Sequence, residues 1–416
     1  MKKLVLVILS LFFTCGLTFA QWTTQSTVFG IDTWPSISVY SSSGVVAAGG
    51  PSGVPKVFKS TNSGVNWTDI SGNLTGPELY CVWAVDANVI YVGDGGSNGG
   101  SGGNAKIWKT TNGGTNWTVI ANTGGTAGFF NGIVFSRINP MIGIAMSDPP
   151  TFGSLPFVLK TTNGGTNWFN QTSIVSGIAT ANAVFCEDNL FYGWGLSGTA
   201  TPSIMLTTDG GNTWNIKNIG FTANDYVSGV AFRSDRLIGI AAGGSLLPSI
   251  SRSVDGGTNW TVTNTVLPVT SVDFTRMKWV YGTNICYLTS QAGASGCVGK
   301  STNSGANWSI MSTNGVTGLF NFDLINVGGT VYAYAITDQG IVIRLQESVT
   351  GIQQISSEII SGYSLDQNYP NPFNPRTAIS FQLPAVSKVV LKIYDMMGCE
   401  VQTLVNEKMQ PGIYEV

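Results

Sequence analysis

The 416-residue chain contains no histidine and few charged residues. Without imidazole there can be no Ser-His-Asp triad, no Cys-His pair, no His-ligated zinc and no histidine general base. Charged residues make up only 10% of the chain, and its net charge of −2 offers no basic surface for nucleic acid. Hydrophobic residues nevertheless make up 43%, unlike a disordered polymer. The composition therefore predicts a folded protein whose chemistry does not depend on histidine.

Six cysteines are present, and none has the paired C-x-x-C spacing of a metal site. Cys286 and Cys297 flank a Gly/Ser-rich connection, so one hypothesis is a disulfide between two neighbouring strands; the other is that both are free thiols. Cys81 and Cys186 are interpreted as small buried hydrophobic residues. We expect no metal and no cofactor.

Residues 1–20 have the pattern of a secretory signal peptide. Lys2 and Lys3 precede an apolar run over 4–13, and small residues lead up to Ala20, after which cleavage is expected. The apolar run is shorter than the roughly 20 residues that a membrane-spanning helix needs. No later segment resembles a transmembrane helix, so the mature protein is predicted to be exported.

A nine-residue phrase recurs six times and organises most of the chain. The copies occupy residues 59–67, 109–117, 160–168, 206–214, 252–260 and 300–308, and each ends in Trp. Successive tryptophans lie 46 to 51 residues apart, which is the period of a four-stranded propeller blade. Between the copies come short alternating runs, so each unit is predicted to be three strands, the phrase as a turn, and a fourth strand.

The residue types of the phrase suit a tight turn. An Asn or Asp at its fourth position can accept hydrogen bonds from backbone amides, and two small residues then supply positive φ angles. The final Trp is expected to fill the gap between adjacent hairpins. The structural positions of the six copies are Asn62 and Trp67, Asn112 and Trp117, Asn163 and Trp168, Asp209 and Trp214, Asp255 and Trp260, and Asn303 and Trp308.

Counting the repeats predicts seven blades over residues 21–347. Trp22 lies one period before Trp67 and begins a run typical of an outermost strand. Three alternating runs between Gly318 and Glu347 have no fourth strand after them. The first strand and these last three are predicted to form one blade, which closes the ring and removes its exposed sheet edges.

The phrase resembles the Asp-box, or bacterial neuraminidase repeat, S-x-D-x-G-x-T-W. The chain departs from that pattern by carrying Asn at four of the six acidic positions, while Asp209 and Asp255 keep the acid. Proteins with Asp-boxes include sialidases, some glucan hydrolases, the sortilin ectodomain and photosystem II assembly-factor-like proteins. The resemblance implies a β-propeller. It implies little about chemistry, because the box is a structural turn in those families.

A short polar linker, 348–362, precedes a different composition over 363–416. The phrase from Asn368 to Pro375, YPNPFNP after the Asn, and the later run from Leu391 to Gly398 resemble the C-terminal sorting domain of the type IX secretion system, known from Bacteroidetes and their relatives. That resemblance implies a partial immunoglobulin-like sandwich, the type IX machinery as a partner, and a secreted or cell-surface location. The family continues with a W-D-G segment beyond Val416, so this domain is interpreted as truncated.

Two kinds of candidate site follow from the propeller prediction. A glycoside hydrolase needs two converging carboxylates, and the candidates are Asp94, Asp148, Glu187 and Asp188. A sialidase also needs three arginines on its substrate. Arg137, Arg233 and Arg276 lie near the ends of first strands, on the face of the phrase turns, and are interpreted as solvated loop ends.

The opposite face is predicted to carry aromatic residues at five of the points where a blade begins. They are Trp34, Tyr80, Phe130, Tyr226 and Phe320. These rings could hold a sugar or a peptide, or they could simply pack the inner rim of the propeller. The favoured function is a monomeric, non-catalytic module that binds an extracellular protein or glycan. The alternative is a glycoside hydrolase of the sialidase or glucanase type.

Overall fold

The structure is a computed structural model that describes most residues from 21 to 416. Outside the described residues are 1–20, 31–33, 52, 97–102, 126–127, 129, 148–155, 172–177, 198–200, 224, 245–248, 264–273, 291–296, 350–352, 357–360, 370, 373–376, 396 and 410. The predicted signal peptide lies in the first of these ranges. The chain divides into a larger compact unit, Gln21–Val280 with Ile285–Ser348, and a smaller one that contains Val349–Val416.

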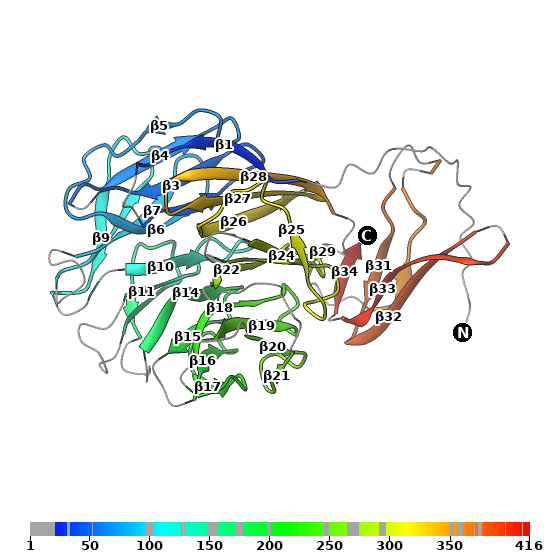
Figure 1. The fold of residues 1–416 in the computed structure, drawn as a ribbon. Helices are drawn as coiled ribbons and strands as arrows, with labels where there is room; N and C mark the ends of the chain where they lie inside the picture. Colours follow the sequence, from blue (N-terminus) through cyan, green and yellow to red (C-terminus); the bar gives the residue numbers. More distant parts are fainter. Residues whose placement is uncertain are drawn as a thin grey trace. The chain divides into compact units, whose positions relative to one another are not determined.

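The larger unit consists of seven four-stranded antiparallel sheets, which we number as blades 1 to 7 along the chain (Figure 1). The blades are β2 (Ser36–Val39), β3 (Val45–Gly49), β4 (Lys56–Ser60) and β5 (Thr68–Asp69); β6 (Leu79–Ala84), β7 (Ile90–Asp94), β8 (Lys106–Thr110) and β9 (Thr118–Asn122); β10 (Phe130–Phe135), β11 (Gly143–Ser147), β12 (Phe157–Thr161) and β13 (Phe169–Asn170); β14 (Ile178–Cys186), β15 (Tyr192–Ser197), β16 (Ser203–Thr207) and β17 (Asn215–Asn218); β18 (Tyr226–Phe232), β19 (Gly239–Gly244), β20 (Ser249–Ser253) and β21 (Thr261–Val262); β22 (Phe274–Trp279), β23 (Cys286–Ser290), β24 (Cys297–Ser301) and β25 (Ser309–Met311); and β26 (Leu319–Val327), β27 (Thr330–Thr337), β28 (Ile341–Ser348) and β1 (Thr23–Thr27). The predicted seven-bladed β-propeller is confirmed.

Blade 7 joins the two ends of the propeller. Its strand order is β1-β28-β27-β26, with Thr23 opposite Arg344 and Thr27 opposite Ile341 (Figure 1). The earliest strand is therefore the outermost strand of the last blade, as predicted. The pairing covers the outer edge of β28, which would otherwise present unpaired backbone groups.

Every blade is a simple up-and-down meander, so its connections fall on two faces. The phrases lie between the third and fourth strands, and the turns between first and second strands lie on the same side; we call this the box face. The connections from second to third strands, and from each blade to the next, lie on the other side, which we call the open face.

The six phrases share one hydrogen-bond pattern. In blade 2 the hydroxyl of Thr110 donates to Asn112 Oδ1 (2.9 Å) and accepts from the backbone N–H of Gly114 (3.0 Å). Asn112 Oδ1 also accepts from the Asn116 N–H at 2.9 Å. The other copies repeat these contacts. The shared contacts need one acceptor oxygen, which explains why Asn replaces Asp in four copies.

The first residue of most phrases connects its blade to the next one. Lys109 Nζ of blade 2 donates to the Gly164 carbonyl in the blade 3 phrase (2.8 Å) and lies 5.1 Å from the centre of the Tyr91 ring. Lys59, Lys160 and Arg252 reach carbonyls in the phrase of the following blade in the same way. Leu206 occupies this position in blade 4 and is buried instead. These cations therefore link neighbouring turns around the ring.

Of the two hypotheses for Cys286 and Cys297, the disulfide is wrong, because Cys286 is a buried free thiol. Register explains the error. Cys286 of β23 lies opposite Ser301 of β24, whereas Cys297 lies opposite Ser290 at the other end of the hairpin. Four strand positions correspond to about 13 Å, which is beyond the Cα separation of about 7 Å that a disulfide bridges.

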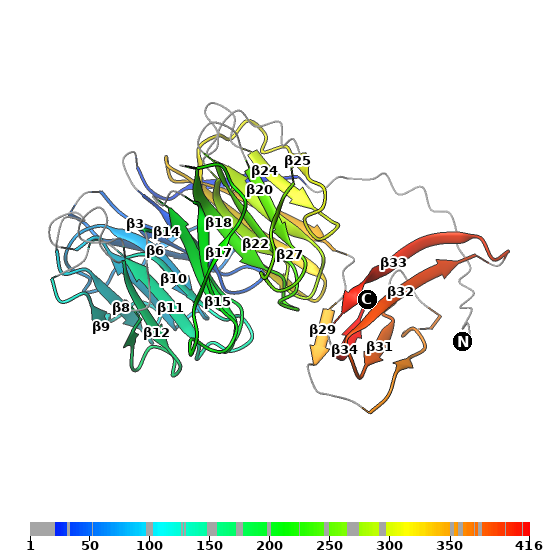
Figure 2. The same ribbon diagram turned by 90° about the horizontal axis from the view of Figure 1, so that it is seen from below.

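The smaller unit is an antiparallel two-sheet sandwich (Figure 2). One sheet has the order β29 (Gln353–Ser356), β34 (Gly412–Glu415), β31 (Ser380–Leu383) and β30 (Ser364–Leu365), and the other is the hairpin of β32 (Ser387–Tyr394) and β33 (Glu400–Met409). Phe381 and Tyr414 pack with Val405 and Met409 between the sheets. The predicted two-sheet sandwich is thus present, and its immunoglobulin-like class stays a prediction.

Candidate functional site

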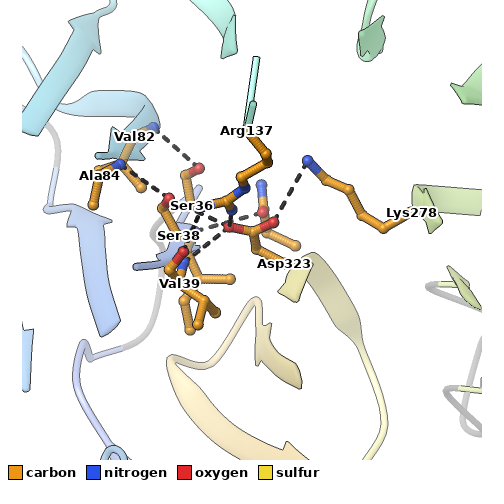
Figure 3. A network of polar contacts seen from close by, with 10 residues as sticks. Ser36, Ser38, Val39, Val82, Ala84, Arg137, Lys278 and Asp323 are labelled. Atoms are coloured by element: carbon orange, nitrogen blue, oxygen red, sulfur yellow. Dashed lines mark hydrogen bonds and ion pairs between the residues drawn. The ribbon is translucent and has the colours of Figure 1, made fainter. Parts of the chain in front are cut away.

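Side chains on the innermost strands connect neighbouring blades where the ring closes (Figure 3). The hydroxyls of Ser36 and Ser38 in blade 1 accept the backbone N–H groups of Val82 and Ala84 in blade 2, at 3.2 and 3.0 Å. Blade 7 does the same to blade 1, because Asp323 Oδ2 accepts the N–H of Val39 at 2.8 Å. Polar residues on these strands thus satisfy backbone groups that no strand partner reaches.

Asp323 is also the common partner of two cations (Figure 3). Arg137, in the turn after β10, places Nη2 2.5 Å from Asp323 Oδ2, and Lys278 of β22 places Nζ 3.5 Å from Oδ1. Burial acts to raise the pKa of the Asp323 carboxyl, but the two cations and the Val39 N–H outweigh it and lower that pKa. Asp323 is therefore an ionised, buried carboxylate at the box-face end of the innermost strands.

Trp83 of β6 completes this cluster. Its ring centre lies 4.3 Å from the guanidinium carbon of Arg137 and 5.2 Å from Lys278 Nζ. Both distances suit cation–π attraction. Blades 2, 3, 6 and 7 thus contribute charged or aromatic groups to one contact network. Arg137 also donates a hydrogen bond to the Val39 carbonyl (2.7 Å), which connects blade 1 to the same network.

The interpretation of the three arginines as solvated loop ends is wrong for Arg233 and Arg276. Arg137 does lie in an exposed turn, but it is paired with Asp323. Arg233 is 4% exposed, contacts Asp235 and donates to Ser304 Oγ at 2.7 Å. Burial lowers the pKa of Arg276 to about 10. No local pattern could reveal these partners, because Arg137 and Asp323 are 186 residues apart in sequence.

Asp94, a candidate catalytic carboxylate, is occupied by structural hydrogen bonds. Its Oδ1 accepts from the backbone N–H groups of Gly96 (3.0 Å) and Lys106 (2.8 Å), and its Oδ2 accepts from Trp108 Nε1 (3.0 Å). Burial raises the pKa of this carboxyl despite these bonds. The side chain is 1% exposed and closes the connection between β7 and β8 on the open face.

Glu187 and Asp188 lie on the other face, in the turn between β14 and β15. Burial and the nearby charges of Asp188 and Asp235 raise the pKa of the Glu187 carboxyl to about 8. Asp188 accepts from two backbone N–H groups of its turn and pairs with Arg236 at 3.1 Å. Asp148 lies outside the described residues. The structure thus places Asp94 at the opposite end of the strands from Glu187 and Asp188.

The open-face aromatic positions depend on a β-bulge that recurs in several innermost strands. In blade 2, Leu79 pairs with Asp94 and Cys81 with Gly93, so Tyr80 is the extra residue. Phe320 is the extra residue at the corresponding point of blade 7. A bulge changes which side of the strand the next residues face. Asn131 and Ser228 occupy this position in blades 3 and 5.

The bulge explains why, of the two alternatives given for these rings, Phe130 packs in the interior and does not face a ligand. Phe130 precedes the bulge, as Leu79 and Leu319 do, and all three are fully buried. Its backbone carbonyl accepts from the Cys81 thiol at 3.1 Å. Tyr226 begins β18, and its side chain lies outside the described part of the structure. Sequence alternation alone gives no signal for such a bulge.

Trp34, Tyr80 and Phe320 all lie at the open-face ends of the innermost strands. They begin three neighbouring blades, 1, 2 and 7. Trp34 is 57% exposed, and its ring lies edge-on to that of Phe320 with ring centres 5.2 Å apart. Tyr80 Oη donates to Glu78 Oε1 at 3.0 Å. This group, which we call the open-face aromatic site, combines an exposed ring with a carboxylate held in place.

No model of a known protein family matches the chain, and no curated protein matches it in sequence. Among solved structures, one similar chain is "YCF48 bound to D1 peptide", with a TM-score of 0.55 and 15% identity over 79% of this chain and 98% of that one. Another is an ancestral GH74 enzyme, with a TM-score of 0.55 and 14% identity over 91% of this chain and 50% of that one.

These similarities concern the fold. This chain spans half the length of the GH74 enzyme. Together with the sheet topology, the comparisons identify the chain as an all-β protein of the β-propeller class. Members of that class differ widely in function. Among the described residues, no helix is long and apolar enough to cross a membrane.

Proposed function

We propose that this chain is an exported, non-catalytic binding module whose ligand contacts the open-face aromatic site. The observation that carries the proposal is the contrast between the two kinds of candidate residue. A glycosidase needs two carboxylates within about 10 Å of each other. Asp94 is fully engaged in hydrogen bonds and lies at the opposite end of the strands from Glu187, and Asp188 beside Glu187 is engaged by two backbone N–H groups and Arg236. Trp34, by contrast, is exposed beside Phe320.

A binding role fits the first structural neighbour. That protein was solved with a D1 peptide, and the match with the present chain covers 98% of its length. At 15% identity this supports only a shared scaffold, so the ligand of the present chain must be argued from its own residues.

The proposal is tested by screening the full chain against glycan and peptide arrays alongside chromogenic glycoside substrates. We expect saturable binding without turnover, lost when Trp34 is changed to Ala. The matched control is Phe169→Ala, which removes a similarly exposed ring (54%) from the outermost strand of blade 3. Turnover of any glycoside, or binding that both variants retain, would contradict the proposed site.

A glycoside hydrolase is the second candidate. One observation favours it: burial and neighbouring acids raise the Glu187 pKa to about 8, as is common for general acids. If the chain hydrolysed glycosides through this residue, Glu187→Gln would reduce turnover by about two orders of magnitude or more, in line with the usual contribution of acid–base catalysis.

We further propose that the smaller unit directs export by the type IX route to the outside of the cell. The support is the resemblance of residues 363–416 to that sorting domain, together with the sandwich they form. The test is to express the chain in a Bacteroidetes host with and without a functional type IX system and to fractionate the cells. Release or surface display only in the competent host is expected, and a chain without 363–416 should stay inside.

A further inference from the structure

The open-face aromatic site contains a carboxylate held by the protein itself. Glu78 precedes β6, and its Oε2 accepts the backbone N–H of Gly53 (2.9 Å) in the connection between β3 and β4. Its Oε1 accepts from Tyr80 Oη at 3.0 Å. Burial acts to raise the pKa of the Glu78 carboxyl, but these hydrogen bonds outweigh it and lower that pKa. The side chain is therefore ionised at neutral pH and fixed in position.

Glu78 has no cation as a partner among the described residues. The two lysines that begin strands on the same face of blades 1 and 2 are engaged elsewhere. Lys56 pairs with Asp69 at 2.7 Å, and Lys106 lies over the Trp108 ring at 5.5 Å. A half-buried carboxylate without a counter-ion attracts a cation from outside the protein.

Trp34 and Glu78 belong to the same end of the same two blades. Contacts between β2 and β6 join residues 46 positions apart, Ser36 to Val82 and Ser38 to Ala84. Toward the open face, Trp34 lies just before β2, and Tyr80, the hydrogen-bond partner of Glu78, lies at the bulge of β6. The connection that supplies the Gly53 N–H starts beside Trp34 as well, because a Cβ built on Gly49 would touch Pro35 Cα at 3.4 Å.

We propose that the open-face aromatic site binds the cationic side chain, lysine or arginine, of a peptide segment in a partner protein. This rests on the proposed function and specifies its ligand. The exposed Trp34 ring attracts ammonium and guanidinium groups, and the fixed carboxylate adds a charge-assisted hydrogen bond. An anionic ligand would be repelled by Glu78. A neutral sugar could stack on Trp34, but it would leave the Glu78 charge uncompensated.

The test uses fluorescence anisotropy of the full chain with a labelled pentapeptide that contains three lysines. The same peptide with every lysine ε-N-acetylated has equal length and no side-chain charge, and cellotetraose serves as a neutral sugar competitor. Trp34→Ala and Glu78→Gln are the test variants; Gln keeps one acceptor oxygen for the Gly53 N–H, and its amide N–H can donate to Tyr80 Oη. Asp209→Asn is the matched charge control, because four of the six phrases already carry Asn at that position.

We expect binding of the lysine peptide and not of the acetylated peptide. Each test variant should weaken the affinity about fivefold or more, while Asp209→Asn should leave it unchanged. Equal loss in Asp209→Asn would show non-specific charge attraction and overturn the proposal, as would failure of the lysine peptide to bind. Competition by cellotetraose that requires Trp34 but not Glu78 would overturn the cationic ligand while leaving the binding-module function intact.

Discussion

Arg137 and Asp323 connect opposite parts of the ring, with Nη2 and Oδ2 2.5 Å apart although the residues are 186 positions apart in sequence. The same guanidinium donates to the Val39 carbonyl, so one side chain from blade 3 contacts both blade 7 and blade 1. Those two blades meet where the ends of the chain close the propeller. The contact therefore stabilises the closure from inside, in addition to the β1–β28 pairing at the outer edge.

Asp323→Ala should strongly destabilise the propeller. The substitution leaves Lys278 and Arg137 partly buried without their shared carboxylate, and the Val39 N–H without an acceptor. Removing one member of a buried ion pair typically costs about 3–5 kcal/mol. Urea denaturation of the full chain measures the change. The double variant with Arg137→Met should recover part of the loss; a strictly additive double variant would contradict coupling between the two residues.

Glu187 should give the folded protein an unusual pH dependence. Its pKa is raised to about 8 in the folded state, against about 4.3 in an unfolded chain. A raised folded-state pKa means that its contribution to stability is full below the unfolded value and is lost as pH rises toward 8. The urea concentration at the midpoint of denaturation should therefore decrease as the pH is raised from 5 to 8. Glu187→Gln should make this decrease smaller. An equal slope in both proteins would argue against the buried, protonated carboxyl.

Lys109→Met should weaken the connection between blades 2 and 3. The change removes the charged hydrogen bond to Gly164 and the contact with the Tyr91 ring while keeping most of the aliphatic side chain. We expect a loss of about 1–2 kcal/mol in unfolding free energy. Leu206→Met is the matched control, because it changes the same phrase position where no cation is present. If Leu206→Met lowered the free energy of unfolding as much as Lys109→Met does, packing and not the charge would connect the blades.

Within the phrase, the hydroxyl at its second position should contribute more to the free energy of unfolding than an Asp in place of Asn at its fourth position. Thr110→Val leaves the buried Gly114 N–H without its acceptor, which costs about 1–3 kcal/mol. Asn112→Asp keeps the Oδ1 contacts with Thr110 and Asn116 and should change the free energy of unfolding by less than about 0.5 kcal/mol. Thermal denaturation of both variants decides the point: a larger loss in Asn112→Asp would contradict the single-oxygen explanation.

The blades could be predicted from sequence because a tight turn imposes its own local requirements. Thr110, Asn112 and Gly114 lie within five residues and satisfy one another, so every copy of the phrase marks a turn by itself. The same reasoning predicted the closing strand, because the strand count left one unassigned strand at the start of the propeller and three at its end, which together make one blade.

The candidate site could be predicted only in part, because it depends on register and on distant partners. The position relative to the β-bulge decides the burial of these rings: Phe130 precedes the bulge of its strand and is buried, whereas Tyr80 and Phe320 are the extra residues of theirs. No local residue pattern marks the bulge. The offset between Cys286 and Cys297 is likewise a matter of strand register. The partners of Arg137, Val39 and Asp323, are 98 and 186 residues away in sequence. Only closure of the ring brings them next to Arg137, so the sequence alone could not predict these contacts.

Trp117→Ala tests how the phrase tryptophans hold neighbouring blades together. Trp117 is 2% exposed, donates Nε1–H to the Ile70 carbonyl of blade 1 (2.9 Å), and packs in one cluster with Ile70 and partly buried Leu74. Truncation should cost about 3–5 kcal/mol, as for other large core aromatics. Phe169→Ala, at an exposed site, should cost far less. The contacts that Trp117→Ala removes lie between blades 1 and 2. Trp117→Phe should restore most of this packing but not the hydrogen bond to Ile70. An unchanged melting temperature in Trp117→Ala would contradict the position given to this side chain.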